Sequence, residues 1–402
     1  MSMSYALLFG VLLVVGMMGG ELARRVHLPR VIGYVLVGFA LGPLGQAISL
    51  DIIAETRIFV DLALGLVLFD LGRRVDLKWM RRDWTLAASG LAESLASFGA
   101  VFAVFLVLGF PAVESGLAAA IAMTTSPAVL LLIVHDTRSE GQVTERAINL
   151  VALNGLLASI LTTIMLGSAH FESKVGLETA LLHPLYLFLG SLAIGAIMAG
   201  IARIVARAVE KTKDVHFTLI AGLVVAAVGL ATLLRLPVIL ALLSFGLFAR
   251  NDQRGYDLLN VNLAPAGRLL YIVLFVITGA SLPMSALATA GWAAAFFVLA
   301  RAAGKMLAIL LVAPIGGLRL KQSVGLGLAL LPMSSLALLM HHDISRLFPA
   351  FGNALGATFL AGVIVMELVG PLAVNWGLKL AGESMPDLDR TGLHRTFPDP
   401  AA

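Results

Sequence analysis

The chain is a succession of apolar segments, most of them long enough to cross a lipid bilayer, separated by short polar loops. About twenty apolar residues in a helix span the ~30 Å hydrocarbon core of a membrane. Of the 402 residues, 59% are hydrophobic and 13% are charged, a composition that excludes a soluble domain. Because a helix satisfies its own backbone hydrogen bonds in lipid, the pattern predicts an all-α polytopic membrane protein.

The hydrophobic pattern predicts about thirteen transmembrane segments. They lie near residues 4–21, 31–48, 57–72, 85–110, 114–134, 146–169, 180–205, 216–233, 236–249, 266–283, 287–315, 322–341 and 353–380. Residues 1–383 are therefore expected to form one transmembrane domain, and 384–402 a short disordered cytoplasmic tail.

The positive charges are distributed unevenly between alternate loops. With the N-terminus outside, 22 of the 28 Lys and Arg residues lie on the inner side and 4 on the outer side. By the positive-inside rule, this predicts an external N-terminus and a cytoplasmic C-terminus. The positive charge sits in short loops, which argues against a nucleic-acid partner. The chain has no cysteine, which excludes disulfides and thiolate metal sites, and no cofactor or resident metal is predicted.

Two of the predicted segments are interrupted in the middle. Thr125-Ser126-Pro127 breaks the fifth segment, and Pro127 leaves the carbonyl of Met123 without a helical partner. A simple proline kink, with Thr and Ser bonding back to the backbone, is the alternative. The twelfth segment is interrupted in the same way at Pro332 and Ser334, and it runs in the opposite direction. Paired breaks of opposite sense indicate an inverted-repeat secondary transporter.

The two interrupted segments lie in the middle of two three-segment groups, 85–169 and 287–380, which we predict to form the transport core. Charged residues inside these groups are expected to have a specific role, because placing each one in the membrane costs about 2.5–3.5 kcal/mol on the insertion scale. Glu93, Asn154, Thr125, Pro332 and Lys305 lie at similar depths, roughly 12–16 Å from the cytoplasmic ends of their segments. A shared site at this depth is therefore expected.

Three charged residues remain open to a structural interpretation. Glu93 and Arg301 could form an ion pair that only locks two helices together. We also predict that Glu93 pairs with Arg301 or with Lys305 in at least one state. Glu367, which precedes a Gly-Pro sequence, is interpreted as a packing or helix-end residue.

Several stretches together resemble the monovalent cation:proton antiporter-2 family, which has a sodium/proton exchanger-type membrane domain. They are Glu21 to Pro43, Leu64 to Phe69, Thr125-Ser126-Pro127, Arg301-Ala-Ala-Gly-Lys305 and Glu367-Leu-Val-Gly-Pro371. The resemblance implies the sodium/proton antiporter fold, with two crossing broken helices and a homodimer in a bacterial inner membrane. It also implies elevator-like alternating access. The family usually carries an aspartate after the Asn in the sixth segment, and here the pair is Asn154-Gly155.

The expected function is the exchange of a monovalent cation, Na⁺ or K⁺, for protons across the bilayer. Predicted cation ligands are the backbone carbonyls from Met123 to Ser126, the hydroxyls of Thr125 and Ser126, and the Asn154 amide oxygen, since oxygen ligands suit such ions. Proton coupling is assigned to Glu93 or Lys305. Lys305 is preferred because Gly155 removes its usual aspartate partner and because Arg301 competes for Glu93.

Other classes of function are weighed beside this one. Without the aspartate, Arg301 and Lys305 would leave the site positive, which would favour an anion or organic acid at the broken-helix N-termini. A third hypothesis is a membrane protein that transports nothing and serves as a binding or regulatory partner. An intramembrane enzyme is disfavoured, because no protease or cofactor motif is present.

Overall fold

The computed structural model describes residues 5–47, 52–172, 177–209, 213–251, 264–283 and 285–384. The predicted tail, beyond residue 384, lies outside these residues. The helices are α1 (Tyr5–Arg25), α2 (Arg30–Ala47), α3 (Ile52–Arg74), α4 (Leu77–Arg82), α5 (Trp84–Val107), α6 (Ala112–Ala122), α7 (Pro127–Asp136), α8 (Gln142–Glu172), α9 (Leu177–Ala208), α10 (Lys213–Leu233), α11 (Val238–Asn251), α12 (Ala264–Ser281), α13 (Ser285–Val312), α14 (Leu320–Ala329), α15 (Ser335–Leu347) and α16 (Pro349–Ala381), with a 3₁₀ turn, η2 (Ala313–Gly316), between α13 and α14. No strand occurs among the described residues.

Each predicted transmembrane segment corresponds to one helix or to one broken pair of helices, α6 with α7 and α14 with α15. Among the described residues, eight spans are long and apolar enough to cross a membrane, and three further apolar helices are shorter. The all-α membrane fold is therefore confirmed, whereas the number of crossings stays a prediction. The short helix α4 was not predicted. Asp76 caps its N-terminus, and the Asp76 carboxylate accepts hydrogen bonds from the backbone N–H groups of Lys78 and Trp79.

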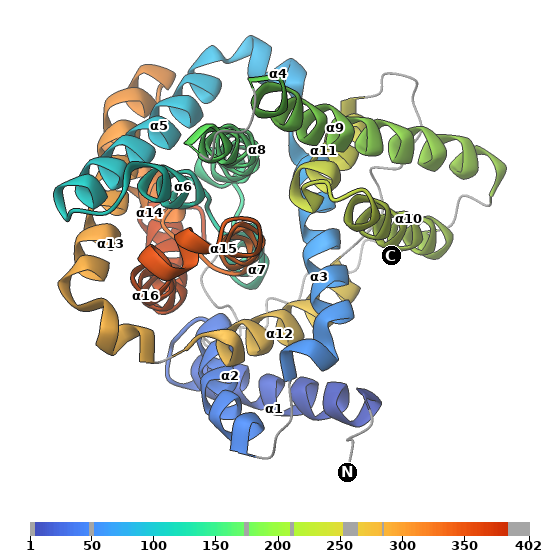
Figure 1. Ribbon diagram of the computed structural model, residues 1–402. Coiled ribbons are helices and arrows are strands. Elements are labelled where there is room, and N and C mark those ends of the chain that lie inside the picture. Colours follow the sequence, from blue (N-terminus) through green and yellow to red (C-terminus); the bar gives the residue numbers. More distant parts are fainter. Residues whose placement is uncertain are drawn as a thin grey trace.

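The helices form two groups that are visible in Figure 1. Helices α5 to α8 and α13 to α16 gather around the two broken pairs. The remaining long helices, α1 to α3 and α9 to α12, lie below this group and to its right in Figure 1. Among them, α12 packs on α2 and α3, and α11 packs on α3 and α9.

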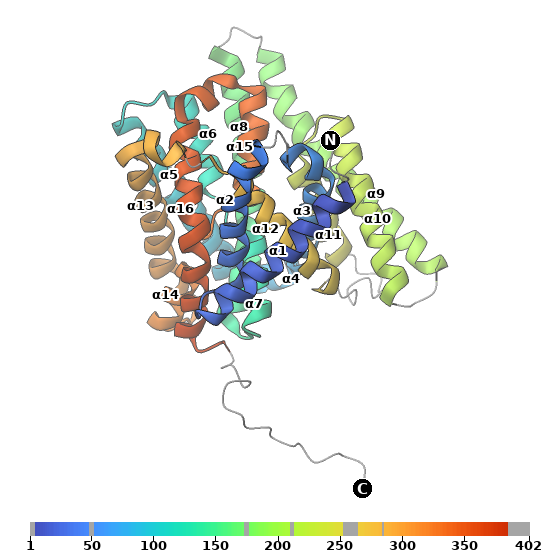
Figure 2. The same ribbon diagram turned by 90° about the horizontal axis from the view of Figure 1, so that it is seen from below.

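The first group contains two units of the same order, each with a long helix, a broken pair and a second long helix. One unit is α5, α6/α7 and α8, and the other is α13, α14/α15 and α16. Figure 2 shows α16 running beside α13, and the two helices pack together. The units join where α13 packs on α5. Gly304 allows this close approach, because a Cβ there would lie 2.7 Å from the carbonyl oxygen of Ala96.

Polar contacts fasten α8 at its N-terminal end. The Arg146 guanidinium donates to Asp83 Oδ2 at 2.7 Å and to the Gly316 carbonyl at 3.2 Å, which links α8 to α5 and η2. Burial acts to raise the pKa of Asp83, but hydrogen bonds from Thr85 and the charge of Arg146 outweigh it, so this pKa lies below its usual value. At the same end Glu383, which follows α16, accepts from the first backbone N–H groups of α8.

Candidate ion-exchange site

The first break separates α6 from α7 and exposes backbone groups inside the protein. Helix α6 ends at Ala122, residues 124–126 are non-helical, and α7 begins at Pro127. Proline is favoured at the first position of a helix because it has no N–H to satisfy. Ser126 caps α7, its side chain accepting from the N–H of Val129. The proline therefore starts a separate helix, and the alternative of a simple kink is wrong.

The two breaks meet in the centre of the core. The N–H of Ser126 donates to the Pro332 carbonyl at 2.9 Å, and the Thr125 hydroxyl donates to the Leu330 carbonyl at 2.8 Å. The hydroxyls of Ser126 and Ser334 are 3.0 Å apart. Each broken helix thus satisfies backbone groups that the other leaves free, which is how irregular backbone is tolerated at this depth.

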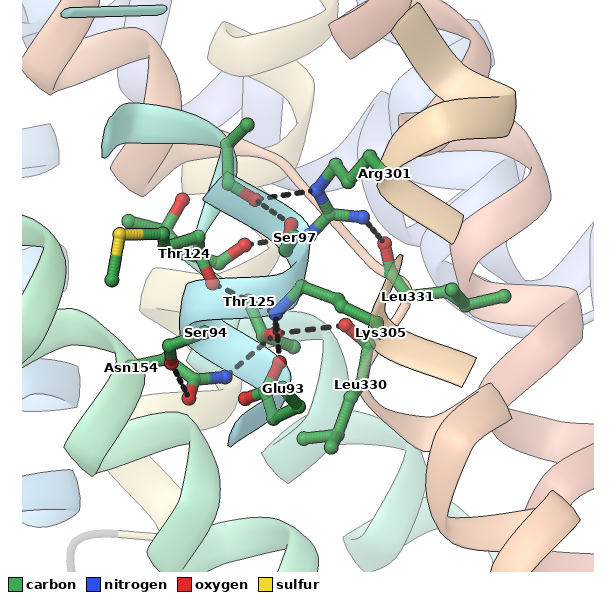
Figure 3. Close-up of polar contacts among 12 residues, drawn as sticks. Glu93, Ser94, Ser97, Thr124, Thr125, Asn154, Arg301, Lys305, Leu330 and Leu331 are labelled. Carbon is green, nitrogen blue, oxygen red and sulfur yellow. Dashed lines mark hydrogen bonds and ion pairs between the residues drawn. The ribbon is translucent and has the colours of Figure 1, made fainter. Parts of the chain in front are cut away.

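Lys305 lies at the first break and forms the predicted ion pair with Glu93 (Figure 3). Its Nζ is 2.7 Å from Glu93 Oε2, 2.8 Å from the Met123 carbonyl oxygen and 3.3 Å from Thr125 Oγ1. The carbonyl freed by Pro127 is therefore bound by an ammonium group of the protein itself. Both charged side chains are fully buried. The second carboxylate oxygen, Glu93 Oε1, has no hydrogen-bond partner among the described residues.

Arg301 forms no ion pair with Glu93, contrary to one of the two predicted pairings. Its guanidinium donates instead to backbone carbonyls from both breaks (Figure 3). The acceptors are Ala122 at 2.8 Å and Thr124 at 2.6 Å in the first break, and Leu331 in the second. The planar fork of arginine suits this role, since its donors reach several acceptors at once. Arg301 therefore does not compete for Glu93, which removes one reason for preferring Lys305 as the proton carrier.

Asn154 of α8 reaches the same cluster, and its neighbour Gly155 lies beside α11. The Asn154 amide donates to Thr125 Oγ1 at 3.2 Å and accepts from the Ser94 hydroxyl at 3.0 Å. A Cβ on Gly155 would lie 3.2 Å from Leu243 Cδ1 of α11, at the contact between the two helix groups. Sequence reasoning missed Ser94, although its position directly after Glu93 was a usable signal.

Most of the predicted cation ligands are engaged by donors of the protein. The Lys305 ammonium donates to the Met123 carbonyl and to Thr125 Oγ1. The Thr124 carbonyl accepts from Arg301, and the Asn154 amide oxygen accepts from the Ser94 hydroxyl. An entering cation would therefore have to replace the Lys305 ammonium among these oxygens. The carbonyls of Leu330 and Leu331 were also missed, because Pro332 frees the carbonyl four residues before it, that of Leu328, and gives no signal for these two.

Two broken helices that meet beside buried charged residues define a secondary transporter. A family model described as "Sodium/hydrogen exchanger, transmembrane" matches residues 9–379. The chain therefore belongs to the sodium/hydrogen exchanger family, and cation/proton antiport is the function that this membership assigns to it. The resemblance found in the sequence is confirmed for the exchanger-type domain, although the family model does not name the antiporter-2 subdivision.

Two solved structures share the fold, both of the sodium proton antiporter MjNhaP1 from Methanocaldococcus jannaschii. The structure at pH 8 has a TM-score of 0.65 and 18% identity, covering 93% of this chain and 95% of that chain. The electron-microscopy structure has a TM-score of 0.70 and 18% identity, covering 96% and 100%. No curated protein matches the chain.

Arg301→Lys should lower the free energy of unfolding by about 1–3 kcal/mol, because a single ammonium cannot satisfy the carbonyls of both breaks. Thermal unfolding in detergent measures the effect. Arg319→Lys, an exposed change near the start of α14, is the matched control and should leave the midpoint unchanged. Equal midpoints for Arg301→Lys and the wild type would contradict the role of Arg301 in joining the two breaks.

Proposed function

We propose that this protein exchanges Na⁺ or K⁺ for protons at the cluster formed by Glu93, Thr125, Asn154 and Lys305. The observation that carries the proposal is the position of Lys305 Nζ, within 3.3 Å of a carboxylate, a carbonyl and a hydroxyl oxygen. Such oxygens are the ligands that hard monovalent cations take. The ammonium group thus occupies the place that a cation would take.

In the proposed exchange the proton leaves from Nζ of Lys305. The cation binds between Glu93 Oε2, the Met123 carbonyl and Thr125 Oγ1, and neutral Lys305 moves aside. Glu93 stays ionised and balances the cation. When the cation leaves, Nζ takes a proton and returns to the same oxygens. One cation replaces one proton, so the charge of the buried site is constant, as its low-dielectric surroundings require.

The alternative of an anion substrate has less support. Its premise is a net positive site, yet Glu93 neutralises Lys305, and the donors of Arg301 point to backbone carbonyls. An anion at this place would have to displace those carbonyls or the Glu93 carboxylate.

The remaining parts of the proposal concern the setting of the site. The two-unit group around the breaks, corresponding to segments 85–169 and 287–380, is proposed to move against the other helices in alternating access. The protein is proposed to be a homodimer in a bacterial inner membrane, with its N-terminus outside. The uneven loop charge supports this orientation.

Proteoliposome flux tests the proposed function. We expect dissipation of an imposed pH gradient on addition of NaCl or KCl, and none with choline chloride at the same ionic strength. Proton movement driven by neither alkali cation, in protein shown to be folded, would contradict the proposal. Uptake of organic anions under the same conditions would favour the alternative.

A further inference from the structure

Glu367, on α16, is a buried carboxyl group that the exchange at Lys305 does not use. Its exposed fraction is 0%, and neither carboxyl oxygen has a hydrogen-bond partner within the described structure. Burying a carboxyl group without partners is among the most costly arrangements in a membrane protein. The sequence-based interpretation as a packing residue does not account for this cost.

The face of α16 that carries Glu367 lies against the second break. A Cβ on Gly370, one turn further along, would lie 2.8 Å from Cα of Pro332. The Ser334 hydroxyl lies near the Glu367 carboxyl, with no hydrogen bond between them. On the neighbouring residue, Met366 Sδ is 3.9 Å from Nη1 of Arg301. Glu367 therefore faces the non-helical residues between α14 and α15.

Oxygen atoms from both breaks converge at this place. The Ser334 hydroxyl is 3.0 Å from that of Ser126 and 3.4 Å from that of Ser335. Helix α15 begins at Ser335, whose N–H donates to the Ser334 hydroxyl oxygen, and the next N–H groups have no acceptor within the helix. Carboxylate and hydroxyl oxygens are suitable ligands for an alkali cation. The positive end of α15 also favours the ionised carboxylate when the cation is bound.

The nearby charged groups do not neutralise Glu367. Arg301 directs its donors to backbone carbonyls, and Glu93 and Lys305 are paired with each other. A proton or a cation must therefore compensate the buried carboxylate. We propose that Glu367 and the Ser334 hydroxyl form a second exchange site, at which a monovalent cation and a proton compete.

The exchange at this site balances in charge. When the cation binds, the carboxyl O–H releases its proton, and when the cation leaves, the carboxylate takes a proton back. Helices α8 and α16 hold the same place in the two units, so α16 supplies the carboxylate that α8 lacks at Gly155. That the competing ions are an alkali cation and a proton rests on the proposed function. The location of the site rests on the positions of Glu367 and Ser334.

Proton release from purified protein in weakly buffered detergent tests this proposal. NaCl or KCl is added near neutral pH, and choline chloride at equal ionic strength is the reference. Glu367→Gln should release about half as many protons per molecule as the wild type, because one of two sites is lost. Glu114→Gln removes another buried carboxyl, in the first turn of α6, and should release as many as the wild type.

Each result separates this site from the one at Lys305. Glutamine matches the neutral carboxyl in shape, and equal thermal unfolding midpoints with and without the change will show that Glu367→Gln is folded. Release equal to the wild type from this variant would overturn the Glu367 proposal and leave the exchange at Lys305 standing. If Glu367→Gln releases no protons while Lys305→Gln releases as many as the wild type, the Lys305 mechanism is overturned instead. No release from the wild type with either cation would overturn both.

Discussion

Replacing Lys305 by Gln should abolish cation-coupled proton movement at the Glu93 site and lower the free energy of unfolding by about 3–5 kcal/mol. The ion pair with Glu93 is fully buried, with 2.7 Å between Nζ and Oε2. Removing the ammonium leaves the carboxylate without its counter-charge in a region of low dielectric constant. The same change leaves the Met123 carbonyl without its donor. Thermal unfolding in detergent and flux in proteoliposomes measure the two effects.

Two further variants show whether the loss arises from the pair. Glu93→Gln combined with Lys305→Gln should recover part of the stability, because neither charge is then left alone. Lys379→Gln makes the same change at an exposed position near the end of α16 and should affect neither measurement. If transport and its pH dependence are unchanged in Lys305→Gln, the lysine is structural. If Glu93→Gln abolishes coupling while Lys305→Gln only destabilises, Glu93 carries the proton.

Gly155→Asp should create or strengthen Na⁺- or K⁺-dependent proton movement. The change places a carboxylate directly after Asn154, whose amide already bonds Thr125 in the first break. The new Cβ would meet Leu243 Cδ1 at 3.2 Å, a contact that a flexible side chain can relieve by a small shift. An additional carboxylate attracts both protons and cations, so it raises the number of ions that the site can exchange. The initial rate of pH-gradient dissipation on addition of each cation is the measurement.

Gly155→Asn is the matched control, since asparagine has nearly the same shape as aspartate and no charge. It should introduce the same contact with Leu243 without any gain in transport. Equal rates for Gly155→Asp, Gly155→Asn and the wild type, all folded, would argue against cation exchange at this cluster. The anion alternative would then be the better explanation of the site.

The sequence by itself determined the membrane fold and the two broken helices. These features could be predicted because lipid tolerates few polar groups and few interruptions, so each one stands out in an apolar chain. Thr125, Pro127, Asn154 and Lys305 were selected on that ground, and the structure brings them to one place. The absence of the aspartate after Asn154 was equally evident from the sequence.

Only the tertiary structure decided which groups meet. Arg301 and Lys305 lie four residues apart on one helical face, so the sequence could not tell which of them pairs with Glu93. Lys305 pairs with Glu93 because the Arg301 guanidinium donates its hydrogen bonds to backbone carbonyls of the two breaks. Rise per residue fixes the depth of a side chain, but helix rotation and packing fix its neighbours. For the same reason, only the packed helices reveal that Glu367 faces the second break without a partner.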